Sequence, residues 1–492
     1  MQLFPGKMVS GTAGMQGMMY MRGNPKVYDT WAQSGNEGWS YDDVMEYFLK
    51  AENNLNLDRM EYGYHGTHGP LMVQQFSDHP PFSESLLEAG RQMGYSVGDL
   101  NGKNQTGFAI AQMMVYDGLR GSTSRMYLRK AAAQNPNLDI LINSQATRII
   151  IDSNNKATGL EYLDKNGNKK TIKVSKEVVA SGGAVGSPQL LMLSGIGVSE
   201  ELQEVGITPI KDLPVGRNLR NHVSVGVGFL INDTSYETLT LDTLMEFVKT
   251  HKGPMASTGI TQNTAFLVSS YVTDGVPDIQ VFFDGFLAGC SKTGMTEECT
   301  SGEFENCGKR SIYTRPTNIK TKSSGYLKLK SSNPLDYPLI YPNYLTDPED
   351  IKVLTEGIKM SIELTKTEAL QNWGMEINTT PEEGCEELAF SSDEYWECVI
   401  RRHTGPENHQ GGSCKMGPAG DSTAVVDPQL RVHGIPNIRV IDASIYPTVP
   451  NSNTIASLVM IAEKGSDMIK DTWNPQAREA RSCTRSGTSQ DC

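Results

Sequence analysis

The sequence predicts an α/β fold, mixed α+β overall, and three of its stretches carry this prediction. Residues 176–197 read as a strand, a glycine turn and a short helix in succession. Residues 278–283 and 325–330 alternate between apolar and polar side chains, which is typical of antiparallel strands with one solvated face. Residues 348–368 repeat apolar side chains at helical spacing. Because the chain has 492 residues, we expect two or more sub-domains that share a large core.

The composition is that of a globular protein. Apolar residues make up 38% and charged residues 21% of the chain, which argues against a mostly disordered chain or a fibrous repeat. No run of residues approaches the roughly 18–20 apolar positions that a transmembrane helix needs. The formal net charge is −13, and an acidic surface of that size repels phosphate backbones. We therefore expect no membrane span and no nucleic-acid partner.

The first half of the chain combines a glycine- and methionine-rich segment with a helix and several strands. The glycines and methionines gather within residues 1–25. A helix is predicted from about Tyr41, because Ser40 can cap its first turn and apolar residues recur on one face. The predicted strands of this half are 139–142, 148–151, 158–163 and 171–174, with a turn over 165–168.

The glycine turn within residues 176–197 leads into a predicted helix. Ser187 is the expected N-cap, Pro188 fits the first helical position, and Gly195 fits the stop. Further along, 437–441 reads as a strand and about 454–469 as the last helix. Residues after about Asn474 are polar.

Eight cysteines indicate an oxidising compartment. They are Cys290, Cys299, Cys307, Cys385, Cys398, Cys414, Cys483 and Cys492. Most lie in short polar loops at local spacing, which favours disulfides of a secreted protein and leaves their connectivity open. No pair has the C-x-x-C spacing of a zinc or thioredoxin-type site, and we expect no metal.

The glycosylation triplets agree with secretion, but the first residues do not. Asn104, Asn232 and Asn378 each begin an N-x-S/T triplet. The N-terminus lacks a basic start followed by an apolar core, so it is not a secretory signal. Our interpretation is a secreted full-length product whose true N-terminus precedes Met1.

His409 and Asn453 are the candidate catalytic residues. A histidine titrates near pH 6.5 and can take a proton from an alcohol, and an asparagine amide can donate to the same oxygen. The plain alternatives are a structural loop histidine and the N-cap of the last helix. Capping and catalysis are compatible, because a helix N-terminus also stabilises developing negative charge.

Two glycine-containing segments are candidates for cofactor contact. Glycines between the strand and helix of 182–197 allow backbone amides to approach a pyrophosphate, although a tight turn alone would look the same. Residues 11–23 mix small residues with methionines and could clamp a planar cofactor or merely pack closely. The chain contains no G-x-G-x-x-G fingerprint and no G-x-S-x-G nucleophile elbow. His65 and His68 lie on a Gly/Tyr-rich stretch that we interpret as a surface loop.

Together these segments resemble the glucose–methanol–choline (GMC) family of FAD-dependent oxidoreductases, from about Gly6 to Lys470. Residues 6–24 resemble the first family signature and 183–197 the second. Residues 213–222, and 412–417 through 426–434 to 440–444, are similar to further family segments. The sequences of residues 395–398 and 404–410 most resemble an insect glucose dehydrogenase and ecdysone oxidase branch of the family.

The resemblance implies a set of site residues. His409 falls on the catalytic histidine and Asn453 on the second His/Asn position. The cofactor-binding residues implied are Thr12, Gln16, Gly17, Ala146, Asp442, Ala443 and Thr454. Within the first signature, Ser10 and Gln16 depart from the usual Gly and Asn, which retunes the flavin loop. The cofactor implied is FAD.

The resemblance also implies an architecture. Family members begin with a βαβ unit that carries G-x-G-x-x-G, and this sequence starts after it. We therefore expect an incomplete Rossmann-like FAD domain built from discontinuous segments, plus an antiparallel-sheet substrate domain. The expected division is 1–66 flavin loop and extended FAD-domain segment, 67–125 substrate-domain segment, 126–228 FAD domain, 229–365 substrate domain, 366–470 C-terminal segment with catalytic residues and FAD contacts, and 471–492 polar tail.

The function implied is oxidation of the CH–OH group of a sugar, a sterol-like alcohol or another small alcohol. His409 acts as the general base, and oxygen or a quinone-like molecule takes the electrons. Two alternatives remain open from the sequence: an inactive or cofactor-poor relative that acts by binding, and a truncated fragment that cannot fold alone.

Overall fold

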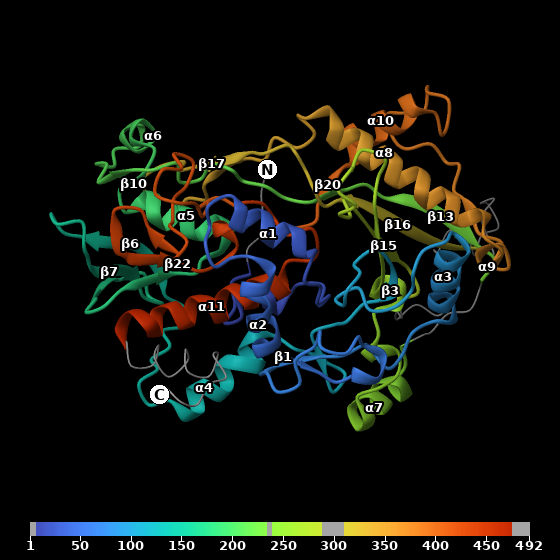
Figure 1. The fold of residues 1–492 in the computed structure, drawn as a ribbon, viewed down its shortest axis with the longest axis horizontal. Helices are drawn as coiled ribbons and strands as arrows, with labels where there is room; N and C mark the ends of the chain where they lie inside the picture. The colour runs from blue at the N-terminus through green and yellow to red at the C-terminus, as the bar shows by residue number, and fades with distance from the viewer. Residues whose placement is uncertain (1–5, 234–238, 288–308, 475–492) are drawn as a thin grey trace.

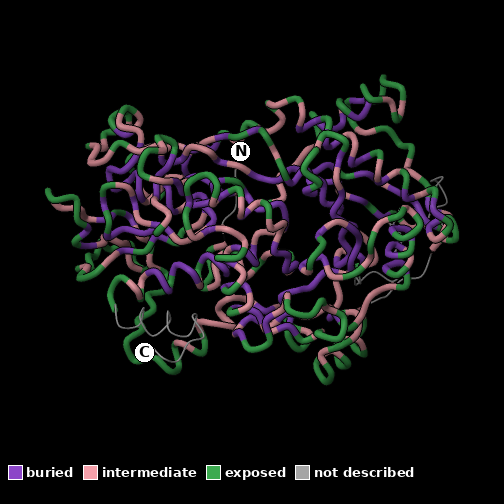
Figure 2. The backbone as a smooth tube through the Cα atoms, in the orientation of Figure 1, coloured by how far each residue is buried: buried purple, intermediate pink, exposed green. Residues whose placement is uncertain are grey.

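The computed structural model describes residues 6–233, 239–287 and 309–474, and its buried apolar side chains form two large clusters, one in each half of the molecule, and a smaller one that includes Met21, Phe266 and Phe282. Figure 1 shows one half around β6, β7, β22, α5 and α11, and the other around β13, β15, β16 and α8. Buried backbone runs through both halves in Figure 2. The mixed helix and sheet fold predicted from the sequence is confirmed.

The first half contains two three-stranded sheets. In one, β9 (Val178–Ala180) pairs in parallel with β22 (Ile435–Val440), which pairs antiparallel with β21 (Arg431–Val432). The other is antiparallel and is formed by β6 (Gln145–Ile151), β7 (Ala157–Leu163) and β8 (Lys169–Lys173). The helices of this half are α1 (Pro25–Gln33), α2 (Tyr41–Ala51), α4 (Arg129–Gln134), α5 (Gly183–Leu193), α6 (Ser199–Glu204) and α11 (Ile455–Trp473).

The second half is built on an antiparallel sheet of eight strands. Its main path runs β19 (Glu376–Ile377), β13 (Val227–Ile231), β16 (Arg310–Asn318), β15 (Ile279–Asp284), β14 (Asn263–Leu267) and β3 (Gly107–Ile110). A branch adds β12 (Val223–Ser224) beside β16 and β20 (Gly405–Pro406) beside β12. Its helices are α3 (Pro81–Gln92), α7 (Leu241–Thr250), α8 (Pro348–Glu363), α9 (Glu368–Gln371) and α10 (Asp393–His403).

Four two-stranded pairs complete the described strands. They are β1 (Glu52–Asn54) with β2 (Leu71–Val73), β4 (Val115–Tyr116) with β5 (Leu119–Arg120), β10 (Ile196–Gly197) with β11 (Lys211–Asp212), and β17 (Tyr326–Lys328) with β18 (Leu339–Tyr341). The stretch 325–330 therefore contributes to a separate pair and not to the large sheet. None of the described helices is long and apolar enough to cross a membrane.

Local sequence signals account for several helix ends. Ser40 caps α2 in a capping box with Asp43, as its sequence predicts. Gly195 follows α5 with φ of 85°, a left-handed conformation that glycine adopts without strain. α8 covers most of the predicted helix at 348–368 and ends at Glu363.

The predicted start of α5 is wrong, and a long-range contact explains it. The helix begins at Gly183, and the hydroxyl of Ser187 accepts from Gly182 N instead of capping. Pro188 lies inside the helix, where its missing N–H leaves the carbonyl of Ala184 without its usual partner. That carbonyl accepts from the hydroxyl of Ser413 at 2.6 Å, so the proline is tolerated.

The predicted strand at 139–142 is also wrong. These residues have no strand partner among the described residues, and Ile142 is 64% exposed. A strand is stable only when its backbone groups pair with a neighbour, so alternation of side chains alone does not create one.

One disulfide lies within the described residues, between Cys385 and Cys398. Cys414 is buried and has no disulfide partner there. The remaining five cysteines lie outside the described residues.

A buried ionic network fixes the segment that contains β1, and it overturns the surface-loop interpretation of His65. The side chain of His65 is 1% exposed, whereas His68 is exposed. Its Nδ1 lies 2.9 Å from Glu52 and its Nε2 lies 2.7 Å from Asp99. Glu52 also pairs with the buried guanidinium of Arg22.

The two carboxylates favour the protonated form of His65. Burial alone would lower the pKa of His65, but the hydrogen bonds to Asp99 and Glu52 outweigh burial and raise its pKa above the usual 6.5. A raised folded-state pKa stabilises the protein fully below the unfolded pKa, and this contribution disappears as pH rises through the folded pKa.

We predict that the free energy of unfolding falls as pH rises above neutrality and that His65→Gln removes most of this fall. The substitution should also lower the free energy of unfolding at pH 6 by about 3 kcal/mol, because it breaks a buried charge pair. Urea unfolding between pH 6 and pH 9 measures both effects. His68→Gln is the matched control on the same loop, and an equal effect of the two substitutions would contradict the prediction.

Candidate functional site

One face of the eight-stranded sheet forms the base of the candidate site. In the register of the sheet, Ser224 of β12 lies opposite Thr317 of β16, and Thr317 lies opposite Gln280 of β15. Residues that lie directly opposite in antiparallel strands point to the same face. Since neighbouring strands lie about 4.8 Å apart, Ser224 and Gln280 stand on this face about 10 Å apart. The adjacent row of the same face holds Phe282 and Arg315.

Two loops stand over this face. The hydroxyl of Ser224 donates to the carboxylate of Glu407, two residues before His409. The amide nitrogen of Gln280 donates to Oδ1 of Asn453 at 2.9 Å. The sheet therefore brings the loops of His409 and Asn453 to the same face.

Strand β20 and one asparagine set the backbone position of His409. β20 pairs with β12 and ends at Pro406, and Asn408 then adopts a left-handed conformation with φ of 59°, which asparagine tolerates better than most residues. The backbone N–H of His409 donates to Oδ1 of Asn221 at 2.8 Å. Glu407 N donates to the carbonyl of His222 at 3.0 Å, so the two segments hold each other in place.

The imidazole of His409 contacts a second histidine that the sequence analysis missed. Nδ1 of His409 lies 3.0 Å from Nδ1 of His222, and the two rings meet edge to face at 84°. His222 is buried, and its Nε2 has no hydrogen-bond partner among the described residues. His409 is partly exposed, and the described residues provide no hydrogen-bond partner for its Nε2. One nitrogen of His409 is thus available to a ligand.

Both histidines are neutral at neutral pH. Burial lowers the pKa of His409 to about 4, the carboxylate of Glu407 opposes this shift, and the guanidinium of Arg315 reinforces it. Burial, followed by the neighbouring His409, lowers the pKa of His222 well below 6.5.

Asn453 lies just before α11 but does not cap it. The N-cap position belongs to Thr454, whose side chain makes no capping bond. The preceding residues are fixed to the chain near α1, because Asn451 Oδ1 accepts from Asn24 N at 2.9 Å and Ser452 donates to the carbonyl of Met21. The capping alternative for Asn453 is therefore wrong.

An arginine between two carboxylates lies beside the His409 loop. Arg315 Nη1 lies 2.6 Å from Glu407 Oε1, and Arg315 Nε contacts Asp284. The guanidinium also lies over the ring of Phe282, 5.0 Å from its centroid.

Thr12, Gln16 and Gly17 lie within residues 6–18, none of which is buried, and Thr12 belongs to a short 3-10 helix, Gly11–Gly14. The Thr12 hydroxyl accepts from Gly6 N at 3.2 Å, and the Gln16 side chain accepts from Met18 N. A Cβ atom added at Gly17 would meet nothing within 4 Å, so the space beside this glycine is open.

Asp442 ties the start of α5 to the segment that follows His409. Its carboxylate accepts from Gly183 N at 2.9 Å, from Ser187 at 2.5 Å and from Ser444. The carbonyl of the adjacent Ala443 accepts from Gly412 N at 3.0 Å. The start of α5, residues 442–444 and the chain beyond His409 are therefore joined.

Ala146 lies elsewhere, on β6 of the first half, opposite Tyr162 of β7. α5 packs beside β6, so Ala146 is connected to the Asp442 region through that helix.

The residues present leave room for a large ligand beside the first turn of α5. Gly183 and Gly186 open α5, and a Cβ atom at either would meet nothing within 4 Å. The amide of Gly183 already donates to the Asp442 carboxylate, so a phosphate at this helix start would have to use the other N–H groups of the first turn. The open space at Gly17 and the accessible Nε2 of His409 provide further contact points.

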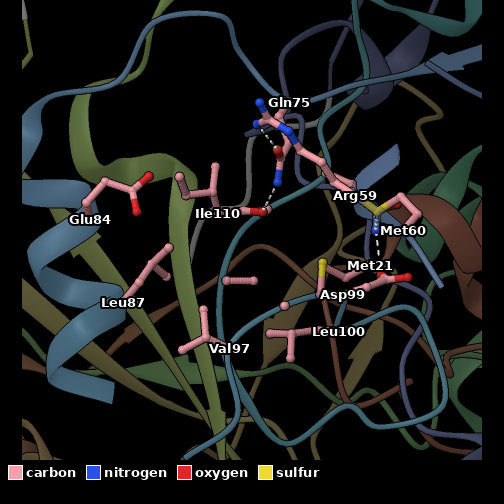
Figure 3. Close-up of a pocket in the computed structure, with 14 residues that line it drawn as sticks. Met21, Arg59, Met60, Gln75, Glu84, Leu87, Val97, Asp99, Leu100 and Ile110 are labelled. Carbon is pink, nitrogen blue, oxygen red and sulfur yellow. Dashed lines mark hydrogen bonds between the residues drawn. The ribbon is translucent and has the colours of Figure 1, made fainter. Parts of the chain in front are cut away.

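A separate cavity of about 180 Å³ lies at β3, an edge strand of the same sheet. Figure 3 shows its lining, with Met21, Val97 and Leu100 among the apolar side chains. Its wall residue Ala109 shares a row of the sheet with Thr264, Phe282 and Arg315.

The row separates this cavity from the candidate site. Thr264 and Phe282 stand between Ala109 and Arg315, and both are buried. Packed side chains therefore lie between the cavity and the site of His409.

Sequence reasoning missed the residues that support the site through strand pairing. Gln280, Arg315 and Ser224 reach it only because β12, β15 and β16 lie side by side. His222 ends the family-like segment 213–222, and that position is the one signal that could have identified it.

The comparisons with known proteins agree on one family. Two family models, both described as GMC oxidoreductase, match residues 1–224 and 321–462. A glucose dehydrogenase (FAD, quinone) of Drosophila pseudoobscura pseudoobscura is 48% identical over 471 residues, which cover 95% of this chain and 74% of the relative. An alcohol dehydrogenase (acceptor) of Pseudomonas putida is 35% identical and is matched over 94% of this chain and 81% of its own.

Solved structures show the same fold. An FAD-dependent oxidoreductase from Chaetomium thermophilum superposes with a TM-score of 0.82 at 21% identity, over 96% of this chain and 87% of that one.

We predict that His409 titrates near pH 4, well below an exposed histidine. Selective ¹⁵N labelling of histidine and NMR at pH 3.5–8 measure this pKa, with His409→Asn to assign the signal. Arg315→Gln should raise the pKa of His409 and Glu407→Gln should lower it, because each removes one nearby charge. A pKa of His409 near 6.5, or shifts of the reverse sign, would contradict the prediction.

Proposed function

Because the chain belongs to the GMC oxidoreductase family, we propose that it is an FAD-dependent oxidoreductase that oxidises the CH–OH group of a small alcohol, with His409 as the general base. The observation that carries the proposal is a neutral imidazole with an accessible Nε2, held on the same sheet face as Asn453. Bound FAD supplies the hydride acceptor. His409 Nε2 removes the proton from the substrate hydroxyl, since a base with a depressed pKa is already deprotonated at neutral pH.

His222 sets the tautomer of His409. For Nε2 to accept a proton, the neutral ring of His409 must carry its hydrogen on Nδ1, where it points at Nδ1 of His222. His222 accepts that hydrogen bond and carries its own hydrogen on Nε2. Once His409 is protonated, the bond from its Nδ1–H becomes charge-assisted and stabilises the imidazolium.

Gln280 sets the orientation of the Asn453 amide. Its amide nitrogen donates to Asn453 Oδ1, which leaves the Nδ2 hydrogens of Asn453 to donate to the oxygen of the substrate. A donor placed where negative charge develops lowers the barrier of the reaction. Asn453 therefore holds the alcohol oxygen while His409 takes its proton.

The residues that would hold FAD come from three separate parts of the chain. Thr12, Gln16 and Gly17 would contact its ring system. Ala443 and Thr454 would supply contacts near the start of α5 and α11, and Ala146 would contact the adenine. Asp442 acts by fixing the first turn of α5, since its carboxylate already accepts from Gly183, Ser187 and Ser444.

The electron acceptor is oxygen or a quinone-like molecule. The Drosophila relative carries quinone in its name, which favours a quinone.

The protein works outside the cell. The disulfide between Cys385 and Cys398 supports an oxidising compartment. The triplets at Asn104 and Asn378 agree with secretion.

We predict that His409→Ala lowers kcat for alcohol oxidation by about 10²–10⁴-fold, because it removes the general base. Flavin absorbance of the purified protein should be unchanged, which separates lost chemistry from lost cofactor. Turnover is measured with a quinone-type dye, and flavin bleaching by the alcohol is followed without the dye.

His68→Ala, an exposed histidine outside the site, is the control. Wild-type turnover in a yellow His409→Ala protein would exclude the base assignment. A wild-type protein that binds no flavin would overturn the proposed function and favour the inactive relative.

We predict that His222→Leu lowers kcat by about 10–10²-fold with little change in KM, because the Nδ1–H of His409 loses its acceptor. His222→Asn retains an acceptor oxygen and should recover part of the loss. Steady-state kinetics of both variants between pH 4 and pH 8 measure this difference. Equal kinetics of the Leu and Asn variants would show that the hydrogen bond plays no part.

A further inference from the structure

The site face of the sheet carries a charged group that the proposed chemistry does not use. Arg315 is bracketed by Glu407 and Asp284. Its side chain and that of Asp284 are each 32% exposed, whereas Glu407 is 10% exposed. The three charges are thus paired with one another but remain partly accessible.

The space next to this charged group is open. Gly405 lies opposite Ser224 in the register, and Gly226 follows Ser224 by two residues. A Cβ atom added at either glycine would meet nothing within 4 Å. The backbone on this side is therefore uncovered, and a ligand can approach the partly exposed Arg315 from there.

We propose that Arg315, held between Asp284 and Glu407, is a specificity-determining residue that binds the neighbouring hydroxyl groups of a polyhydroxylated alcohol such as a monosaccharide. This inference rests on the proposed function and names the substrate class of that same site. Neither matched family segment contains Asp284 or Arg315, which lie between residues 224 and 321.

The chemistry of the group matches a polyol. The guanidinium donates hydrogen bonds and the carboxylates accept them, and each hydroxyl of a polyol can do both. Hydroxyl groups can join these ion pairs without leaving a charge unsatisfied, and the buried ring of Phe282 supports the guanidinium from below.

Other alcohols fit less well. An aliphatic alcohol would displace water from three charged groups and give no hydrogen bonds in return. A quaternary ammonium alcohol needs an aromatic face for its cation. The face of Phe282 beside this charged group is already covered by the guanidinium of Arg315, which would repel a second cation.

The spacing places the group at the right distance from the reacting centre. Arg315 lies two residues before Thr317 on β16, so the two side chains share a face about 7 Å apart. Thr317 lies between Ser224 and Gln280, which hold the loops of His409 and Asn453. One hydroxyl can react at His409 while others of the same ring reach Arg315.

The test compares selectivity and binding in Arg315→Gln. Because Arg315 also acts on the pKa of His409, the measured quantity is the ratio of kcat/KM for D-glucose to kcat/KM for 1-hexanol in the FAD-loaded protein. The wild type should favour D-glucose, and the substitution should lower the ratio about 10²-fold. Binding of 1,5-anhydro-D-glucitol in equilibrium dialysis without electron acceptor should weaken by a similar factor.

Two further variants keep the test decisive. Asp284→Asn retains Arg315 and Glu407 and should also lower the ratio of kcat/KM values, by a smaller factor. This variant provides the test if Arg315→Gln does not fold. Arg310→Gln is the control. Arg310 lies on the same strand as Arg315 and also forms an ion pair, with Asp233, but it faces the opposite side of the sheet.

The outcomes separate this inference from the proposed function. A ratio unchanged within threefold in Arg315→Gln and Asp284→Asn, or a wild type that prefers 1-hexanol, would overturn the role of Arg315 while alcohol oxidation stands. Absence of flavin bleaching by any alcohol would overturn the proposed function, and the dialysis experiment would then decide on polyol binding by itself.

Discussion

The pairing register of three strands is the constraint on which the candidate site depends. Ser224, Thr317 and Gln280 lie in one row across β12, β16 and β15, and the outer two hold the loops of His409 and Asn453. A slip of one residue would turn every side chain of a strand to the other face. Because the opposite face of the sheet packs apolar residues such as Val281 and Phe283 against α8, such a slip would bury polar groups and expose apolar ones. The demands of the core therefore fix the geometry of the site.

Two opposite charges act on the imidazole of His409. Glu407 raises the pKa of His409 and Arg315 lowers it, which leaves burial as the dominant cause of the depressed value. An unpaired carboxylate at the same place would raise the pKa of His409 further. Pairing Glu407 with Arg315 thus places a carboxylate beside the base while a cation opposes its effect on the pKa of His409.

Local signals and the family resemblance predicted much of this molecule. The capping box of α2, the strand β9, the glycine that ends α5 and the strand β15 follow from short-range chemistry in the sequence. The resemblance supplied His409 and Asn453, which no periodicity singles out. Contacts between distant segments could not be predicted. Ser187 forms hydrogen bonds with Gly182 and Asp442 instead of capping its helix. The carbonyl of Ala184, to which Pro188 has no N–H to donate, accepts from Ser413 instead. His222 meets His409 only because two loops lie together after folding.

Two histidines illustrate why residue type alone does not reveal function. His65 lies between Glu52 and Asp99, which raise its pKa and favour its charged form, and it ties the segment of β1 to Asp99. His409 has a neutral neighbour at Nδ1 and no described partner at Nε2, and its pKa is lowered. A proton added to His65 is stabilised by the two carboxylates that contact its ring, so its release is unfavourable. A proton added to His409 is held only by a neutral ring, so it can leave again within a catalytic cycle. The number of anions in direct contact with each imidazole therefore separates the structural histidine from the one suited to proton transfer.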